Sequence, residues 1–344
     1  MKVGLIDVDG HNFPNLPLMK LAAWHKKQGD HVEWYQPLIS GHMDKVYLSK
    51  VFSFTPDYEW VIDADEVIKG GSGYCISLVN GKEVFDKSKD IELPYEIEHI
   101  YPDYSLYPEL TKDTAYGFLT RGCPRGCGFC HVEAKEGKCS RKVADLSEFW
   151  NGQKNIVLCD PNILACPEHI QLLEQLKDSK AKVDFNQGLD IRLMTDKNLD
   201  LLKQIKLKMI HIAFDDYKQK EIIEPRMRLL QQKLNYDHRK VMCYILTNFD
   251  TTIEQDIYRI QLCRELDIAP YPMIYDKEHC DPIYKKLQRW CNNFIFWKVP
   301  TFDEYLGGTQ KARNELDNQT TELDNRKGNQ TTKTKVNLRE KCQL

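Results

Sequence analysis

Strand-like and helix-like segments alternate along the second part of the chain, and this alternation restricts the fold more than any other feature. Six short apolar runs predict strands at 116–120, 155–159, 183–185, 209–214, 241–247 and 271–275. Segments with helical spacing lie at about 146–151, 167–179, 197–206, 218–235 and 252–266. Such alternation builds parallel sheets covered by helices. Six repeats predict a partial (β/α)6 TIM-type barrel, whose strands carry the chemistry at their carboxyl ends.

The first part of the chain predicts a second α/β unit. Strands are expected at 2–8, 31–35, 45–54 and 66–69, with a helix over 17–28 that ends at Gly29. This order is typical of a doubly wound parallel sheet, in which ligands bind beyond the carboxyl ends of the strands. The loop that follows the first strand is therefore a candidate binding segment.

Composition shifts mark the remaining boundaries. We expect an N-terminal domain at 1–95, a Tyr- and Pro-rich connector at 96–114, and the barrel at 115–300. Residues 306–344 are dominated by polar side chains and repeat the strings Glu-Leu-Asp-Asn and Asn-Gln-Thr-Thr. Such a segment buries too little apolar surface to offset its ordering entropy, so we predict a disordered tail.

Charge and hydropathy exclude several classes of protein. The 344 residues carry a formal net charge of −3, so nothing indicates a nucleic acid as partner. No apolar run approaches the ~20 residues that span a membrane. Without an N-terminal signal sequence, we expect a cytoplasmic protein whose twelve cysteines are reduced. Seven of these stand alone in apolar or helical segments and should be buried as small hydrophobic residues: Cys75, Cys159, Cys166, Cys243, Cys263, Cys280 and Cys291.

Three clustered cysteines directly follow the first strand of the predicted barrel. Cys123, Cys127 and Cys130 have C-x3-C-x2-C spacing. Thiolates are soft ligands for iron–sulfur clusters, zinc or copper(I), and three ligands leave a fourth coordination position open. A loop that wraps around a cluster needs positive φ angles, which glycine adopts without strain. The glycines available for this are Gly122, Gly126 and Gly128.

Other interpretations of the cysteine loop stay open. His131 next to Cys130 could complete a zinc site, and the string from Cys127 to His131 also matches a haem attachment sequence or a C-x-x-C redox pair. Cys139 could act as a fourth thiolate and close the coordination. In either the zinc case or the closed-cluster case, the chain would be a non-catalytic zinc- or iron–sulfur-binding scaffold.

The C-x3-C-x2-C spacing, with Phe129 just before the third cysteine, resembles the signature of the radical SAM enzymes. The resemblance implies that Cys123, Cys127 and Cys130 hold a [4Fe–4S] cluster and that Phe129 lies near the adenine of S-adenosyl-L-methionine. It implies reductive cleavage to a 5′-deoxyadenosyl radical that abstracts hydrogen from a substrate. The electron would come from a donor such as flavodoxin or ferredoxin, and the substrate, a small molecule or a peptide, stays unassigned.

The first domain resembles the cobalamin-binding domain that precedes the barrel in one branch of this family. Asp9 and His11 match two positions of the motif D-x-H-x-x-G, whose His ligates cobalt, but Pro14 stands where the glycine should be. Many members keep this fold without the cofactor. The resemblance therefore implies the Rossmann-like domain, with cobalamin as the less favoured alternative and His11 as its ligand.

Polar residues at the strand ends complete the predicted site. By resemblance, Asp160 after the second strand would meet the methionine amino group, and Asp215 after the fourth would meet the ribose hydroxyls. The densest polar string, 186–192, contains Gln187 and Arg192, which we also predict to bind the cofactor. A guanidinium suits the methionine carboxylate. The glycine-glycine-glutamate segment that usually follows the second strand in the family is absent.

Overall fold

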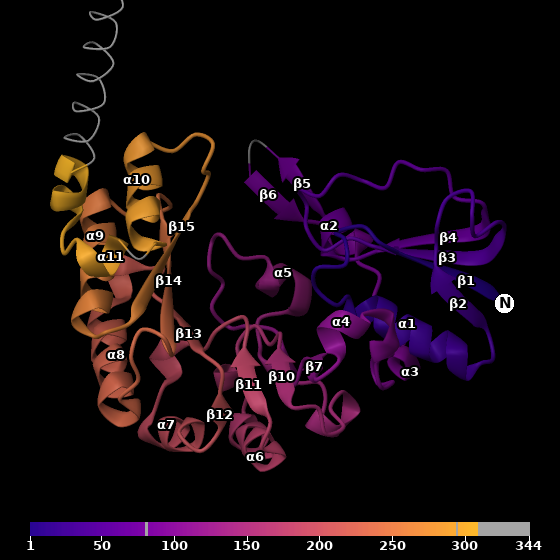
Figure 1. Ribbon diagram of the computed structural model, residues 1–344, viewed down its shortest axis with the longest axis horizontal. Helices are drawn as coiled ribbons and strands as arrows, with labels where there is room; N and C mark the ends of the chain where they lie inside the picture. Colours follow the sequence, from indigo (N-terminus) through magenta and orange to yellow (C-terminus); the bar gives the residue numbers. More distant parts are fainter. Residues whose placement is uncertain (80–81, 294, 309–344) are drawn as a thin grey trace, which may run out of the picture. The chain divides into compact units, whose positions relative to one another are not determined.

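The computed structural model is described for residues 1–79, 82–293 and 295–308 (Figure 1). It is a mixed α/β structure built on parallel sheets. Most of the predicted tail, from residue 309 on, lies outside the described residues. Within the described part, no helix has the length and apolar character required to cross a membrane.

The strands are short, as the brief apolar runs in the sequence predict. Their bounds are β1 Lys2–Asp7, β2 His31–Trp34, β3 Met43–Ser49, β4 Ala64–Gly70, β5 Ile76–Val79, β6 Lys82–Phe85, β7 Thr114–Gly117, β8 Thr120–Arg121, β9 Arg141–Lys142, β10 Asn155–Leu158, β11 Lys182–Phe185, β12 Lys206–Leu207, β13 Ile210–Ala213, β14 Val241–Thr247 and β15 Ala269–Ile274.

The helices fall into long ones, which follow strands, and single turns in the connections. Their bounds are α1 Leu16–Lys27, α2 Ser72–Cys75, α3 Tyr95–Glu98, α4 Pro108–Thr111, α5 Val132–Glu136, α6 His169–Ser179, α7 Asp196–Leu202, α8 Lys220–Leu234, α9 Ile253–Glu265, α10 Pro282–Cys291 and α11 Ile295–Lys298.

The N-terminal sheet has the order β2-β1-β3-β4, with every neighbouring pair parallel. Helix α1 begins where the Asn15 side chain accepts a hydrogen bond from the Leu18 amide, and it packs on one face of the sheet. The second face is covered by irregular chain that includes Tyr58 and Ile62. The parallel sheet is thus as predicted, but helices do not wind it on both sides. The connections 35–42 and 50–63 contain prolines and lack helical spacing, so they cross as loops.

The connector is packed into the structure through its tyrosines. The Tyr107 hydroxyl donates to a carboxylate oxygen of Asp7 at 2.7 Å, at the end of β1. The Tyr104 hydroxyl donates to the carbonyl oxygen of Phe149 at 2.6 Å. Tyr107 is 3% exposed, and burial raises the pKa values of both phenols. These residues therefore act in packing between β1 and β7.

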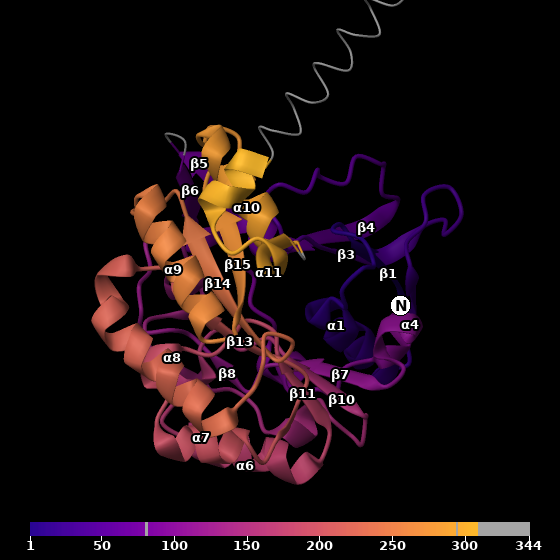
Figure 2. The ribbon, with the colours of Figure 1, turned by 60° about the vertical axis from the view of Figure 1, so that its left-hand side comes forward.

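The later strands form open sheets. One has the order β12-β11-β10-β7 with parallel pairs, and another the order β13-β14-β15 (Figures 1 and 2). Strand β12 has two residues. Among the described residues, an isolated parallel bridge between Leu189, after β11, and Ile212 of β13 links the two sheets. No barrel closes among the described residues. The structure shows parallel sheets with helices, and the partial TIM-type barrel stays a prediction.

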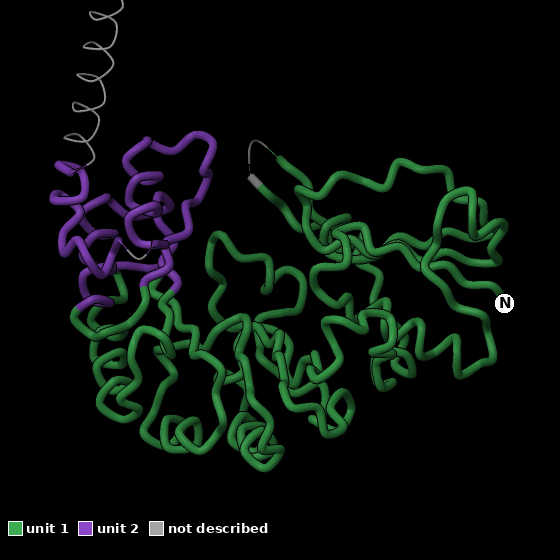
Figure 3. The backbone as a smooth tube through the Cα atoms, viewed as in Figure 1, with its two compact units in different colours: residues 1–214, 218–243, 265–269 green, residues 215–217, 244–264, 270–344 purple. Residues whose placement is uncertain are grey.

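The chain divides into two compact units (Figure 3). Residues 1–214, 218–243 and 265–269 form the first unit, which contains the N-terminal sheet and the cysteine loop. The second contains 215–217, 244–264 and the described residues from 270 on. The domain boundaries expected from the sequence stay predictions.

Candidate metal centre

The cysteine loop begins beyond the carboxyl end of β7 and is closed at its base by a short antiparallel pair. In that pair Thr120 lies opposite Lys142, and Arg121 opposite Arg141. The chain between β8 and β9 contains the three cysteines and α5. Because β7, β10 and β11 are parallel neighbours, the segments that follow them meet at one edge of the sheet.

Backbone contacts fix both ends of the loop. Gly122 has a φ of +89°, and a Cβ built there would lie 2.2 Å from the carbonyl oxygen of Cys139. The Gly122 amide donates to Glu136 Oε2 at 3.0 Å, and the same carboxylate accepts from Arg121. Gly126 also has a positive φ of +58°, whereas Gly128 does not, so the prediction for Gly128 was wrong. Only glycine fits position 122.

The three thiols differ in exposure. Cys123 and Cys127 are half-buried, and Cys130 is exposed. Among the described residues, no group of three or more His, Cys, Asp and Glu side chains lies close enough together to hold a metal ion. Cys139 is exposed, and the His131 ring pairs with Glu83 at 3.3 Å.

Two arginines share one buried carboxylate beside these thiols. Asp190 accepts from Arg125 Nε at 2.5 Å and from Arg192 Nε at 2.7 Å. Burial opposes ionisation of Asp190, but the hydrogen bonds and charges of the two guanidinium groups outweigh it and lower its pKa. Thiols at Cys123 and Cys127 are close enough to act on the charge of Arg192. Two positive charges against one negative charge favour an anion here.

Asn162 links this group to the first cysteine and has an unpartnered oxygen. Its Nδ2 donates to Cys123 Sγ at 3.5 Å and to Asp190 at 3.2 Å. Its Oδ1 is buried and accepts no hydrogen bond within the described structure. Buried acceptors are nearly always satisfied in folded proteins, so this oxygen is open to a donor from water or from a ligand.

The carboxylate of Asp160, two residues earlier, already accepts hydrogen bonds from groups of the protein. Its carboxylate accepts from the Thr120 amide at 2.5 Å, the Thr120 hydroxyl at 2.7 Å and the Leu119 amide at 3.1 Å. Burial raises its pKa to about 6. Asp160 therefore ties the end of β10 to the chain that enters the cysteine loop.

The other predicted cofactor residues lie in different settings. Arg192 uses Nε and Nη2 on Asp190, and its Nη1 donates to Gln219 at 2.8 Å. Gln187 is exposed after β11, and Phe129 is half-buried in the loop. Asp215 belongs to the second unit, where it accepts from the Leu246 amide at 2.8 Å. Phe129 thus belongs to the cysteine loop, and of the other three, Arg192 lies beside the loop by its contacts with Asp190.

The residues that sequence reasoning did not assign are Arg125, Asn162 and Asp190. Asn162 and Asp190 belong to polar strings after the second and third predicted strands, but nothing local gave them a role. Arg125 lies between two of the cysteines, and its contact with Asp190 spans 65 residues. The prediction that the seven isolated cysteines are buried is confirmed for all of them.

The N-terminal loop places Asp9 and His11 in separate contacts. The Asp9 carboxylate accepts from the Val51 amide at 2.5 Å and the Thr55 hydroxyl at 2.6 Å, so it holds the chain that follows β3. The His11 ring lies 4.3 Å from the Trp34 ring, centroid to centroid. Cobalt ligation by His11 stays a prediction.

The fold and the site together define the class of the protein: an α/β protein with a three-cysteine loop at the carboxyl edge of a parallel sheet. Comparison of the sequence with models of known protein families gives no match, and comparison with curated proteins gives none.

Proposed function

We propose that the chain is a radical SAM enzyme, with Cys123, Cys127 and Cys130 as ligands of a [4Fe–4S] cluster. The observation that carries the proposal is the position of the C-x3-C-x2-C loop. It follows β7, next to the segments after β10 and β11, which bring the unpartnered buried oxygen of Asn162 and the guanidinium of Arg192 beside its first cysteines. Soft thiolates, positive charge and a hydrogen-bond acceptor are what an anionic cluster and an amino acid cosubstrate require.

Bound there, the cluster would supply the electron that splits S-adenosyl-L-methionine into methionine and a 5′-deoxyadenosyl radical. The chain's own residues would hold and orient the cosubstrate. Asn162 Oδ1 would accept a hydrogen bond from its amino group. Arg125 engages only Nε among the described contacts, so its two terminal nitrogens suit the methionine carboxylate. Arg192 would position Asp190 and Arg125 through the shared carboxylate.

These assignments revise part of the expectation from sequence. Because Asp160 is satisfied by backbone and hydroxyl donors, we assign the amino-group contact to Asn162 instead. Phe129 near the adenine, Asp215 near the ribose and Gln187 stay in the proposal on the family resemblance alone. The same holds for the partial barrel, a cytoplasmic location and an electron donor such as flavodoxin or ferredoxin.

Metal content tests the ligand set directly. After anaerobic reconstitution with iron and sulfide, the protein should bind about four irons per chain and show the brown absorption of an iron–sulfur cluster. Cys123→Ser, Cys127→Ser and Cys130→Ser should each lose most of this iron. Cys139→Ser is the matched control, since it removes an exposed thiol nearby, and it should keep the iron. Zinc in place of iron, or equal losses in all four variants, would contradict the proposal.

A further inference from the structure

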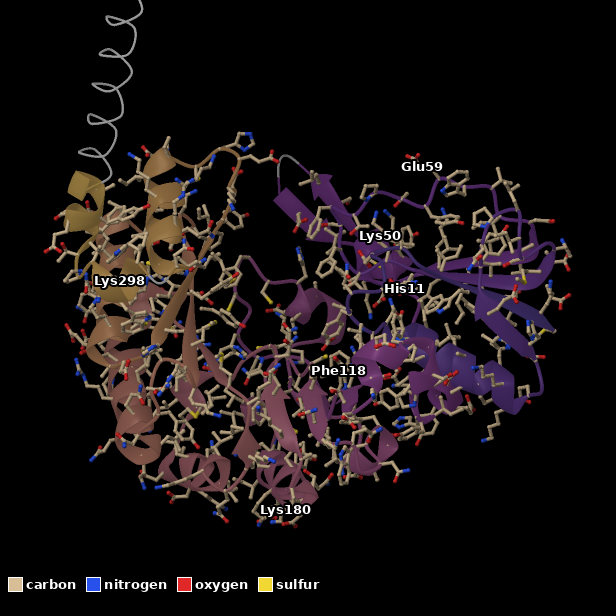
Figure 4. The ribbon with its side chains drawn as sticks, viewed as in Figure 1. His11, Lys50, Glu59, Phe118, Lys180 and Lys298 are labelled. Atoms are coloured by element: carbon tan, nitrogen blue, oxygen red, sulfur yellow. The ribbon has the colours of Figure 1, made fainter. Side chains whose placement is uncertain are left out.

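A hollow of about 580 Å³ lies beyond the carboxyl ends of β1 and β2, away from the cysteine loop in sequence. Its wall comes from the last residues of these strands, from His11 and from the segment 56–60. Figure 4 labels His11, after β1, and Glu59, after β3, on the two segments that contribute to it. Small-molecule sites in proteins commonly enclose about 300–1,000 Å³.

Aromatic rings form much of this wall. Trp34, Tyr35, Tyr58 and Trp60 all line it. Trp34 is held in place by ring contacts with His11 at 4.3 Å and Tyr107 at 5.4 Å between centroids. Trp60 is 66% exposed, which is high for a residue of its size. An exposed tryptophan at the rim of a hollow is a typical contact for a ligand.

The segment 51–63, which contains the wall residues 56–60, is held at both ends by hydrogen bonds. Asp9 accepts from Val51 and Thr55 at its start, and the Tyr35 hydroxyl accepts from the Asp63 amide at 2.9 Å at its end. The hydroxyl of Tyr58 is buried and has no hydrogen-bond partner in the described structure. The wall is therefore built, and it contains one polar group whose partner is missing.

The charge of the wall is negative. Asp7, Asp57 and Glu59 line the hollow, and no Lys or Arg does. Asp7 accepts from Tyr107, and Asp57 pairs with Lys50 at 2.6 Å. Glu59 makes no ion pair with any residue that the structure describes. Aromatic faces beside an uncompensated carboxylate such as Glu59 attract cations, and the attraction grows as water is excluded.

We propose that this hollow binds an organic cation of small-metabolite size, with its cationic group against Trp34 and Trp60 and near Glu59. The chemistry that fits is a quaternary ammonium or a comparably delocalised cation, because such groups are weakly hydrated and gain most from aromatic faces. The site uses none of the residues assigned to the metal centre, so it stands or fails independently of the proposed function.

Isothermal titration calorimetry of the full chain tests the proposal with three probes. Choline and benzyltrimethylammonium should bind saturably, and dimethylbutanol, the neutral carbon analogue of choline, should bind at least about fivefold more weakly. Trp60→Leu and Glu59→Gln should each weaken cation binding by about fivefold or more. Both residues are exposed, and circular dichroism checks that the variants are folded.

Val61→Ala is the matched control, because Val61 is 85% exposed and does not line the hollow. It should bind the cations as the unaltered chain does. The proposal is overturned if neither cation binds, if the neutral analogue binds as tightly as choline, or if Trp60→Leu and Glu59→Gln leave cation binding unchanged.

Discussion

Asp160 shows how one buried carboxyl group couples folding to pH. Its pKa rises from its ordinary value of 3.8 to about 6, because burial disfavours the charged form. The folded protein then holds the proton more tightly than the unfolded chain. The associated stability is complete below the unfolded pKa and is lost as pH rises through about 6.

The prediction compares the unaltered chain with Asp160→Asn, which does not titrate. Between about pH 4 and pH 7, the free energy of unfolding of the unaltered chain should fall relative to that of the variant, by up to about 3 kcal/mol. Urea denaturation across this range measures the free energy of unfolding of both proteins. The contributions of the other carboxyl groups cancel in the difference between them. Parallel pH profiles would show that Asp160 titrates normally in the folded state.

A substitution at Asn162 should change the affinity for S-adenosyl-L-methionine without much change in the stability of the fold. Asn162→Leu removes a buried oxygen that has no partner, together with two long hydrogen bonds. The free energy of unfolding should therefore change by less than about 1 kcal/mol. Affinity of the reconstituted protein for S-adenosyl-L-methionine should fall at least about tenfold, because an amine donor loses its acceptor.

Thermal unfolding of the metal-free chain and equilibrium dialysis with labelled cosubstrate measure these two quantities. Asp160→Asn is the comparison variant, since Asp160 is assigned no contact with the cosubstrate. Unchanged affinity together with a large loss of stability would mean that Asn162 acts only in packing.

At the scale of elements, Gly122 decides how the cysteine loop leaves β8. Alanine there combines a positive φ with a Cβ 2.2 Å from a backbone oxygen. Gly137→Ala has a similar φ, +97°, but its Cβ meets nothing within 4 Å. We expect Gly122→Ala to destabilise the chain by about 2 kcal/mol more than Gly137→Ala, because only the former forces the backbone to shift.

Chemical denaturation of the two variants measures this difference. Gly122→Ala should also bind less iron after reconstitution, since the β8–β9 pair that closes the loop is displaced. Equal stability of the two variants would mean that the loop tolerates a side chain at position 122.

Elements that are defined by nearby residues could be predicted from the sequence, and elements that depend on distant residues could not. Strands such as β14 and helices such as α1 were found because an apolar run or a capping residue defines them locally. The β8–β9 pair was not, since two-residue strands leave no periodic pattern. The division of the later strands between sheets depends on pairing between distant strands, and the two-residue β12 at the edge of one sheet is too short to leave a pattern in the sequence.

In the candidate site too, the local features could be predicted from the sequence, and the contacts between distant residues could not. The cysteine spacing is local and could be read directly, whereas the Arg125–Asp190 contact joins residues 65 positions apart. Asp160 and Asn162 both follow the same predicted strand, and the family resemblance favoured Asp160 for the contact with the amino group. In the structure, Asp160 accepts hydrogen bonds from the protein itself, whereas Asn162 keeps a buried oxygen without a partner among the described residues.

At the scale of the whole molecule, the metal centre and the aromatic hollow lie in the first compact unit, at the carboxyl edges of two different parallel sheets. Parallel sheets gather loop residues from distant parts of the chain at such edges, so each sheet provides one candidate site. We therefore expect cation binding to the hollow to persist in the Cys123→Ser variant, and calorimetry on that variant tests it. Loss of cation binding there would show that the two sites are coupled.

The central claim is that three thiols hold a cluster with one iron left for the cosubstrate. Electron paramagnetic resonance of the reconstituted, reduced protein tests it most directly. We predict a [4Fe–4S] signal whose shape changes when S-adenosyl-L-methionine is added. The signal should not change when adenosine, which lacks the amino and carboxylate groups of the cosubstrate, is added instead. A signal that stays the same in saturating S-adenosyl-L-methionine, or no cluster signal at all, would contradict the account.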